Sequence, residues 1–246
     1  MRLVLALVLT CLALPAATVA GTTASYVNGD GKRLVLDVGD NGAIRIGGVE
    51  PQQYGIIEND ELYLVETRSG APKVARLRDI SAAFDQVMGP MLKGLFDAAA
   101  KAPAPRAGLR IEKGSATSFA GFQGRNYRIT GIDTGNPSRT VDWIVSTDPA
   151  LAPVGRGLQM FLESTMVLAA PFLGPQTNDM IADIRRTFAL GTPLSAPGQF
   201  QIETVKPADF PEGHFTLPAV PQTVEDIVGG MKQGMQQAAE ALAPAK

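Results

Sequence analysis

Residues 115–151, SATSFAGFQGRNYRITGIDTGNPSRTVDWIVSTDPAL, contain two runs in which apolar and polar residues alternate. The apolar positions are Tyr127 and Ile129 in the first run and Val141, Trp143 and Val145 in the second, where only Ile144 is out of step. Because successive side chains of a strand point to opposite faces, each run has one apolar face. Between the runs, Gly135, Asn136 and Pro137 favour a turn. The stretch therefore predicts a β-hairpin in an antiparallel sheet that meets water on one face only.

Outward from this hairpin, the sequence predicts more strands and a set of helices. Alternating patterns predict strands within residues 22–77, at 108–114 and at 199–205. Apolar residues at spacings of three and four predict helices at 80–99, about 153–168, 178–188 and 224–242. Gly89 and Pro90 predict a kink or a break within the first helix. The expected fold class is α+β, a single twisted antiparallel sheet with helices packed across its apolar face.

The N-terminus, residues 1–20, has the pattern of a secretory signal peptide. Arg2 is followed by an apolar run that is shorter than the roughly 20 residues a membrane-spanning helix needs. The small residues Thr18 and Ala20 predict cleavage after Ala20, and an uncleaved anchor is the alternative. Residues 21–246 are then expected to form one periplasmic domain that is not an integral membrane protein and is large enough to build its own core.

Composition argues against several function classes. A formal net charge of −2, with no basic block, argues against binding nucleic acid. The single cysteine, Cys11, lies within the signal peptide, so the mature chain has no disulfide and no thiolate site. The single histidine, His214, is too isolated for a transition-metal site and is expected on a surface loop, where replacement changes stability by less than about 0.5 kcal/mol. No catalytic residue, metal or cofactor is therefore predicted.

The apolar face of the hairpin needs a cover, since a large exposed apolar surface promotes aggregation. The helix at 80–99 is expected to supply it, as the more mobile element of the fold. Its methionines suit a surface that repacks around varied apolar ligands, although they also match an ordinary helix-to-sheet core. The side chains predicted to line a ligand cavity between this helix and the hairpin are Phe84, Met88, Met91, Leu95, Tyr127, Ile129, Val141, Trp143 and Val145.

Several motifs, taken together, resemble a known family. They are YVNGDGKR, IIENDELYLV, FAGFQGRNYRI, VDWIVSTDPAL and a late FTLP. With them the chain resembles a family of bacterial periplasmic domains related to the lipoprotein-carrier (LolA-like) half-barrel. The residues that match its two strand motifs are Gly121, Phe122 and Tyr127, then Asp142, Trp143, Asp148 and Leu151. The resemblance implies a half-barrel sheet that holds acyl chains in the concavity beneath its helices, and it implies no catalytic residues. Many relatives have a cysteine near Gly124 that this chain lacks, so no redox role is implied.

The expected function is therefore that of a non-enzymatic periplasmic protein. It would bind an apolar ligand or a lipid-modified partner, such as a lipid, an acyl chain or a lipoprotein, in the concavity between sheet and helices. The alternative is a structural or protein-interaction module of the cell envelope with a filled core and no ligand. A hydrolase is a third, weaker hypothesis, because the sequence lacks the usual nucleophile motifs.

Overall fold

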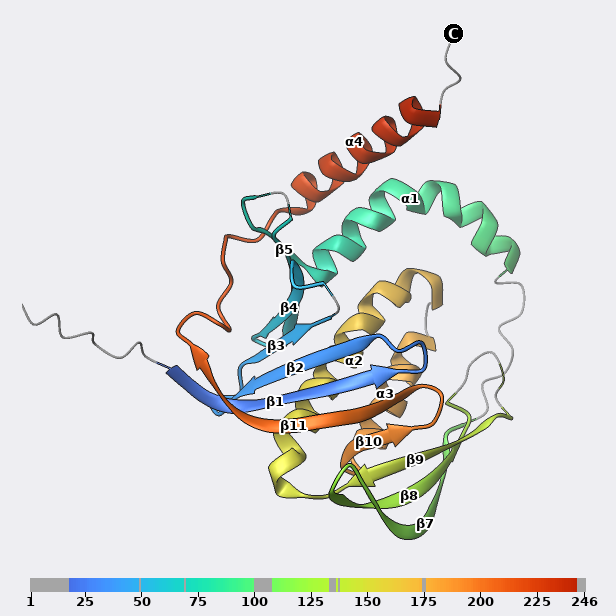
Figure 1. Ribbon diagram of the computed structural model, residues 1–246. Coiled ribbons are helices and arrows are strands. Elements are labelled where there is room, and N and C mark those ends of the chain that lie inside the picture. The colour runs from blue at the N-terminus through green and yellow to red at the C-terminus, as the bar shows by residue number, and fades with distance from the viewer. Residues whose placement is uncertain are drawn as a thin grey trace, which may run out of the picture.

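The computed structural model describes residues 18–242 apart from positions 49, 69, 100–107, 133–135, 137, 174 and 175. Within this part of the chain, eleven strands form one open antiparallel sheet, accompanied by four α-helices (Figure 1). The strand order is β6-β5-β4-β3-β2-β1-β11-β10-β9-β8-β7, so the first strand lies in the middle of the sheet. The predicted α+β class with a single antiparallel sheet is confirmed.

The helices follow the predicted spacing closely. They are α1 (Leu77–Ala99), α2 (Ala152–Leu173), α3 (Gln176–Phe188) and α4 (Val224–Leu242), with a 3-10 turn at Pro149–Leu151 before α2. Helix α1 continues through Gly89 and Pro90, so the chain does not break there, and Figure 1 shows the helix bent along its length. Helix α4 packs on α1, on the side away from the sheet (Figure 1).

The strands alternate as the sequence predicts, with one addition. They are β1 (Thr18–Asn28), β2 (Arg33–Gly39), β3 (Ile44–Gly47), β4 (Gln53–Glu58), β5 (Glu61–Glu66), β6 (Lys73–Arg76), β7 (Arg110–Phe119), β8 (Phe122–Thr130), β9 (Thr140–Ser146), β10 (Thr192–Ala196) and β11 (Phe200–Pro211). Strand β10 was not predicted. All five of its residues are buried, so it shows no alternation, and its register against β9 shifts after Pro193.

The hairpin of β8 and β9 forms as predicted. Tyr127 lies opposite Trp143, and Ile129 lies opposite Val141. On the other face, Arg128 and Asp142 are both exposed and 3.5 Å apart. The turn residues Gly135 and Pro137 lie outside the described residues. The face opposite Trp143 therefore meets water at Arg128 and Asp142, whereas Ile144 on that same face packs against the main core, so the prediction of one wetted face is confirmed only in part.

The strands β3 to β6 differ, because both of their faces are covered. One face contributes Ile44, Ile46 and Leu62 to the main core beneath α2. The other face has a second apolar cluster of Ile56, Tyr63, Val65 and Val74, against which Leu217 and Ala219 pack. The chain after β11 thus crosses this outer face, and the Gln222 amide then donates to the Val74 carbonyl at 2.8 Å. The prediction of a sheet wetted on one face is wrong for this half.

Helix α2 is the main support of the sheet, and it contacts β2, β5 and β10. Its residues Val154 and Leu158 are buried in the main core. The approach to β10 requires glycine, because a Cβ added to Gly155 would lie 2.4 Å from the Thr192 Oγ1. The first turns of α2 therefore rest directly on the sheet.

Strand β1 begins before the predicted cleavage site. Thr18 pairs with Pro211, Val19 with Phe210 and Ala20 with Asp209. Cleavage after Ala20 remains a prediction, and it would remove these pairs from the end of the β1–β11 ladder while leaving those from Gly21 onward.

Candidate ligand-binding site

An apolar cavity, called the larger cavity below, has a volume of about 450 Å³. It lies between strands β2 to β6 on one side and helices α1 and α2 on the other. Its apolar walls include Leu34, Ile46, Leu64, Ile80 and Phe161. A volume in this range, with mostly apolar walls, is typical of sites that bind small molecules.

Two small residues lie among the large apolar side chains of the sheet wall. Gly55 pairs with Ile46 on one side and Leu64 on the other, and Leu64 pairs in turn with Ala75. All four residues line the larger cavity. A Cβ at Gly55 would lie 2.8 Å from the Leu62 Cδ1, so even alanine would force Leu62 to move. The Leu62 side chain therefore occupies the space over Gly55, and the small side chain of Ala75 leaves the wall beside Leu64 thinly covered.

Leu64 shows that the cavity wall is incompletely covered. Its neighbour Leu62 is only 2% exposed, whereas Leu64 is 39% exposed although it lines the cavity. An exposed apolar side chain in a concave wall is a feature that a bound apolar molecule would cover.

A smaller cavity of about 300 Å³ adjoins the larger one. Leu34 and Phe161 line both. The other apolar side chains of the smaller cavity are Tyr26, Val27, Leu158, Leu162 and Phe200. The Tyr26 hydroxyl donates to the Pro193 carbonyl at 3.1 Å, and burial raises the pKa of Tyr26 far above its usual value. Tyr26 therefore remains neutral and adds no charge to the cavity.

The polar residues of the smaller cavity are gathered in one place. Asn28, Lys32 and Arg33 belong to the turn that joins β1 and β2, at one end of the cavity. In the larger cavity the polar lining residues are Gln53, Glu66, Lys73 and Gln222, at the ends of β4, β5 and β6 and just before α4. Each cavity thus has an apolar interior and a polar rim.

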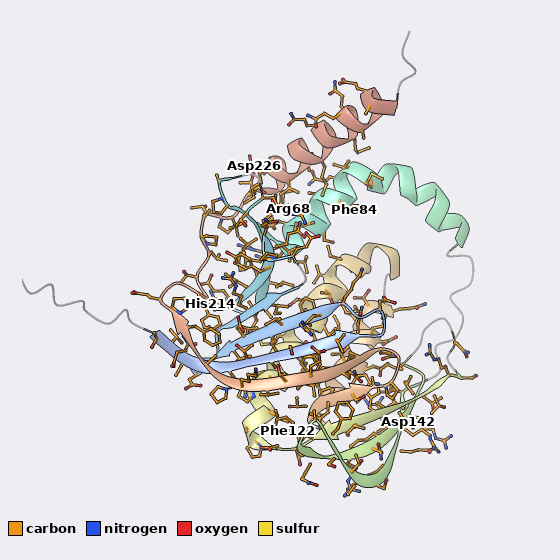
Figure 2. The ribbon with its side chains drawn as sticks, in the orientation of Figure 1. Arg68, Phe84, Phe122, Asp142, His214 and Asp226 are labelled. Carbon is orange, nitrogen blue, oxygen red and sulfur yellow. The ribbon has the colours of Figure 1, made fainter. Side chains whose placement is uncertain are left out.

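The residues predicted to line a site are divided between two regions. Ile129, Val141, Trp143 and Val145 are buried, and with Leu109 and Ala196 they form a packed group, called the Trp143 cluster below. Tyr127 packs against this cluster. Phe84 and Met88 are half-buried on α1, and Figure 2 shows Phe84 at the opposite end of the molecule from Asp142 of β9. The side chains of Met91 and Leu95 lie outside the described part of the chain.

Of the predicted lining residues whose side chains the structure describes, none lines either of the two apolar cavities. The lining residues that the prediction omitted, such as Leu34, Gly55, Leu64 and Phe161, come from β2, β4, β5 and α2. One signal was present in the sequence, since a glycine inside a strand marks a place where side-chain volume is missing. Gly55 stands in the middle of QYGIIE.

The Trp143 cluster is filled. The Trp143 ring meets Phe188 of α3 and Phe200 of β11 edge-on, with ring centroids 6.5 and 5.3 Å apart. Trp143 is 4% exposed, and its indole N–H has no hydrogen-bond partner among the described residues. Phe200 also lines the smaller cavity, so this ring separates that cavity from the Trp143 cluster.

His214 lies in the turn after β11, as predicted, but it is half-buried and is not isolated there. Its Nε2 is within hydrogen-bonding distance, 2.8 Å, of the Asp37 Oδ2, and its ring stacks on Phe210 with centroids 4.7 Å apart. The Arg45 guanidinium donates to the His214 carbonyl at 3.0 Å. Figure 2 shows the residue where the chain leaves β11. These contacts fasten the segment after β11 to the outer face of β2 and β3.

Two further cavities are polar, and their charged groups are mostly engaged in structural contacts. In one, of about 260 Å³, Arg76 pairs with Glu61 at 2.8 Å and Arg185 with Glu163 at 2.7 Å. The other, of about 350 Å³, contains Asp148, whose carboxylate accepts from the Ala150 amide at 2.9 Å. His214 lines neither cavity. Among the residues that the structure describes, no group of three or more His, Cys, Asp or Glu side chains is arranged to hold a metal ion.

Comparisons with known proteins leave the family of this chain open. No protein-family model matches the chain, and no curated protein matches it. Across residues 18–242, gaps aside, no helix is both long and apolar enough to cross a membrane. The candidate site therefore consists of the two neighbouring apolar cavities with polar rims, which lie between the sheet and helices α1 and α2.

Proposed function

We propose that this protein is a non-enzymatic periplasmic protein that binds an apolar ligand, or the lipid part of a lipid-modified partner, between its sheet and helices. The observation that supports the proposal is the pair of apolar cavities that meet at Leu34 and Phe161. Both volumes fall within the roughly 300–1,000 Å³ typical of small-molecule sites. An acyl chain there would gain about 0.8 kcal/mol for each methylene group removed from water.

The proposal includes a half-barrel arrangement, with α1 and α2 lying across the concave face of the sheet. Two observations support it. Helix α2 contacts β2, β5 and β10, and α1 contacts β5 and β6, so helices reach both halves of the sheet. The motif resemblance to the LolA-like family implies the same arrangement.

The periplasmic location rests on residues 1–20. We expect the exported protein to begin at Gly21, which N-terminal sequencing of protein purified from the periplasm would show. A chain that still begins at Met1, or a lipid-modified Cys11, would contradict both the signal peptide and the proposed location.

Binding can be tested by titrating delipidated full-length mature protein with an apolar fluorescent dye and displacing the dye with palmitate. Leu64→Glu places a charge on the cavity wall and should abolish dye binding, because an ionised carboxylate is strongly disfavoured next to a buried acyl chain. Leu168→Glu is the matched control. Leu168 is 37% exposed on α2, almost the same as Leu64, and it lines neither apolar cavity. This variant should bind the dye like the unmodified protein.

Gly48→Leu provides a second variant that does not depend on a new charge. Gly48 lines the larger cavity, and a Cβ there meets no atom within 4 Å. The leucine should therefore occupy part of the cavity and weaken dye binding, while Gly108→Leu, at an exposed position with equally open space, should not.

The alternative function, a structural or protein-interaction module with a filled core, is favoured by the close packing of the Trp143 cluster. That function predicts no saturable dye binding by the unmodified protein. It also predicts no lipid in organic extracts of protein purified from its own periplasm. Both results together would replace the ligand-binding proposal.

A further inference from the structure

The rim of the smaller cavity is cationic. Its polar lining residues are Asn28, Lys32 and Arg33, and no carboxylate is among the residues that line it. Arg33 is paired with Glu203 at 2.7 Å. Lys32 forms no ion pair with any residue that the structure describes. An apolar cavity with an unpaired ammonium group at its rim has the charge that an anionic head group would complement.

The turn that contains Lys32 is held in place. The Asn28 side-chain oxygen accepts from the Lys32 amide at 2.7 Å and from the Asp30 amide at 3.1 Å. The Gly29 amide donates to the Gln199 carbonyl at 3.0 Å, which ties this turn to the turn between β10 and β11. The backbone of Lys32 is therefore fixed at the rim, and only its flexible side chain needs to order when it meets a ligand.

The rim of the larger cavity has a different charge. Glu66 and Lys73 both line it, and they lie opposite each other on β5 and β6. Their charges cancel, and the other polar lining residues, Gln53 and Gln222, are neutral. The two cavities therefore differ in the charge of their rims, which is cationic at Lys32 and neutral at Lys73.

We propose that the ligand is an amphiphile with one acyl chain and an anionic head group, bound in a single direction. The head group lies at the rim of the smaller cavity beside Lys32. The chain passes Phe161 and Leu34, which line both cavities, and ends beneath α1 in the larger cavity. This inference rests on the proposed function, because it names the class and the orientation of the ligand in the same site.

The contribution of the head group should be modest and sensitive to salt. Lys32 is exposed, and exposed ion pairs are weakened by solvent and by added salt. Their typical strength corresponds to a change in Kd of about two- to fivefold. The acyl chain therefore supplies most of the affinity, and Lys32 selects the charge of the head.

The test uses dye displacement from the delipidated mature protein at low salt by three probes of equal chain length, palmitate, hexadecanol and hexadecyltrimethylammonium. Palmitate should bind about two- to fivefold more tightly than hexadecanol, hexadecyltrimethylammonium should bind most weakly, and the differences should vanish at about 1 M salt. Lys32→Met should remove the preference for palmitate. Lys73→Met, at the neutral rim, should retain it.

Palmitoyl lysophosphatidylglycerol distinguishes the source of the charge, because tighter binding than palmitate indicates a phosphate head group rather than a free carboxylate.

Failure of this inference differs from failure of the proposed function. Equal displacement by all three probes, or an equal effect of Lys32→Met and Lys73→Met, would overturn the anionic head group while leaving an apolar site. No displacement by any probe would overturn the apolar site itself. A palmitate preference that Lys32→Met removes and Lys73→Met retains would support the proposed orientation.

Discussion

The Trp143 cluster and the larger cavity are built on the same sheet, yet one is filled and the other is open. In the cluster, Trp143 lies between Phe188 and Phe200, and large side chains from β8, β9 and α3 meet there. In the cavity, Gly55 and Ala75 stand on either side of Leu64. Side-chain volume at these positions decides whether the space beneath a helix becomes core or cavity. Strand pattern alone does not distinguish the two.

The largest expected effect lies in the filled region. Trp143→Ala should lower the free energy of unfolding by about 3–5 kcal/mol, because it leaves a large void among packed rings. Urea unfolding of the purified variant measures this loss. Trp143→Phe should cost much less, since the indole N–H makes no hydrogen bond to the described residues. A loss below about 1 kcal/mol for Trp143→Ala would show that this region is open as well, and the comparison would fail.

The next effect concerns the outer face of the open half. His214→Ala should lower the free energy of unfolding by about 1–2 kcal/mol, because it removes a partly buried contact with Asp37 and leaves that carboxylate with one partner fewer. His214→Gln can still form a hydrogen bond and should cost less. Chemical denaturation at neutral pH compares the two variants. Unchanged stability for His214→Ala would restore the earlier prediction of a free surface histidine.

A smaller effect is expected at the cavity wall. Leu64→Ala should lower the free energy of unfolding by less than about 1 kcal/mol, because Leu64 is already 39% exposed. Leu62→Ala, two residues earlier and 2% exposed, should cost about 2–5 kcal/mol. Unfolding of both variants without ligand measures the difference. Equal losses would mean that Leu64 belongs to the packed core, and the cavity would not be open in solution.

The smallest effect is a dependence of stability on acid. Burial raises the pKa of Glu163, but hydrogen bonds from Arg185 and Gln159 lower it by more, so the pKa in the folded protein lies below 4.5. A lowered carboxyl pKa stabilises the fold above the unfolded value, and this contribution is lost as pH falls through the folded value. As the pH falls through the folded-state pKa of Glu163, the melting temperature of Arg185→Met should fall less than that of the unmodified protein. Identical acid dependence would contradict this link between α2 and α3.

Much of the fold followed from periodicity. The hairpin of β8 and β9, strand β2 and all four helices could be predicted from their apolar faces. Strands β3 to β6 are apolar on both faces and could be predicted because clear turn residues separate them. Strand β10 could not, since burial on both faces removes the alternation. The cover on the outer face of β3 to β6 was also missed, because Leu217 and Ala219 lie in a proline-rich segment without any repeat.

The site was harder to predict than the fold. Periodicity showed that Trp143 and Phe84 each lie on an apolar face, but it did not show which helix meets which strand. Helix α3 covers Trp143, whereas α1 lies over β5 and β6. The open space depends on how Leu62 and Leu64 pack beside the small residues Gly55 and Ala75, and such packing produces no repeating pattern in the sequence.

The position of β1 has a consequence for how the chain folds. Ser25 of β1 contacts Thr204 of β11 across a separation of 179 residues, and the ladder between these strands occupies the centre of the sheet. Contacts so distant in sequence give a high contact order. They slow folding, because a long loop must close before the stabilising contacts between the two strands can form. During synthesis β1 can pair early with β2, but its other partner, β11, exists only when nearly the whole chain has been made. Before β11 has been synthesised, the edges of β1 and β10 that will face it have no partner. The centre of the sheet therefore stays incomplete until synthesis is almost finished.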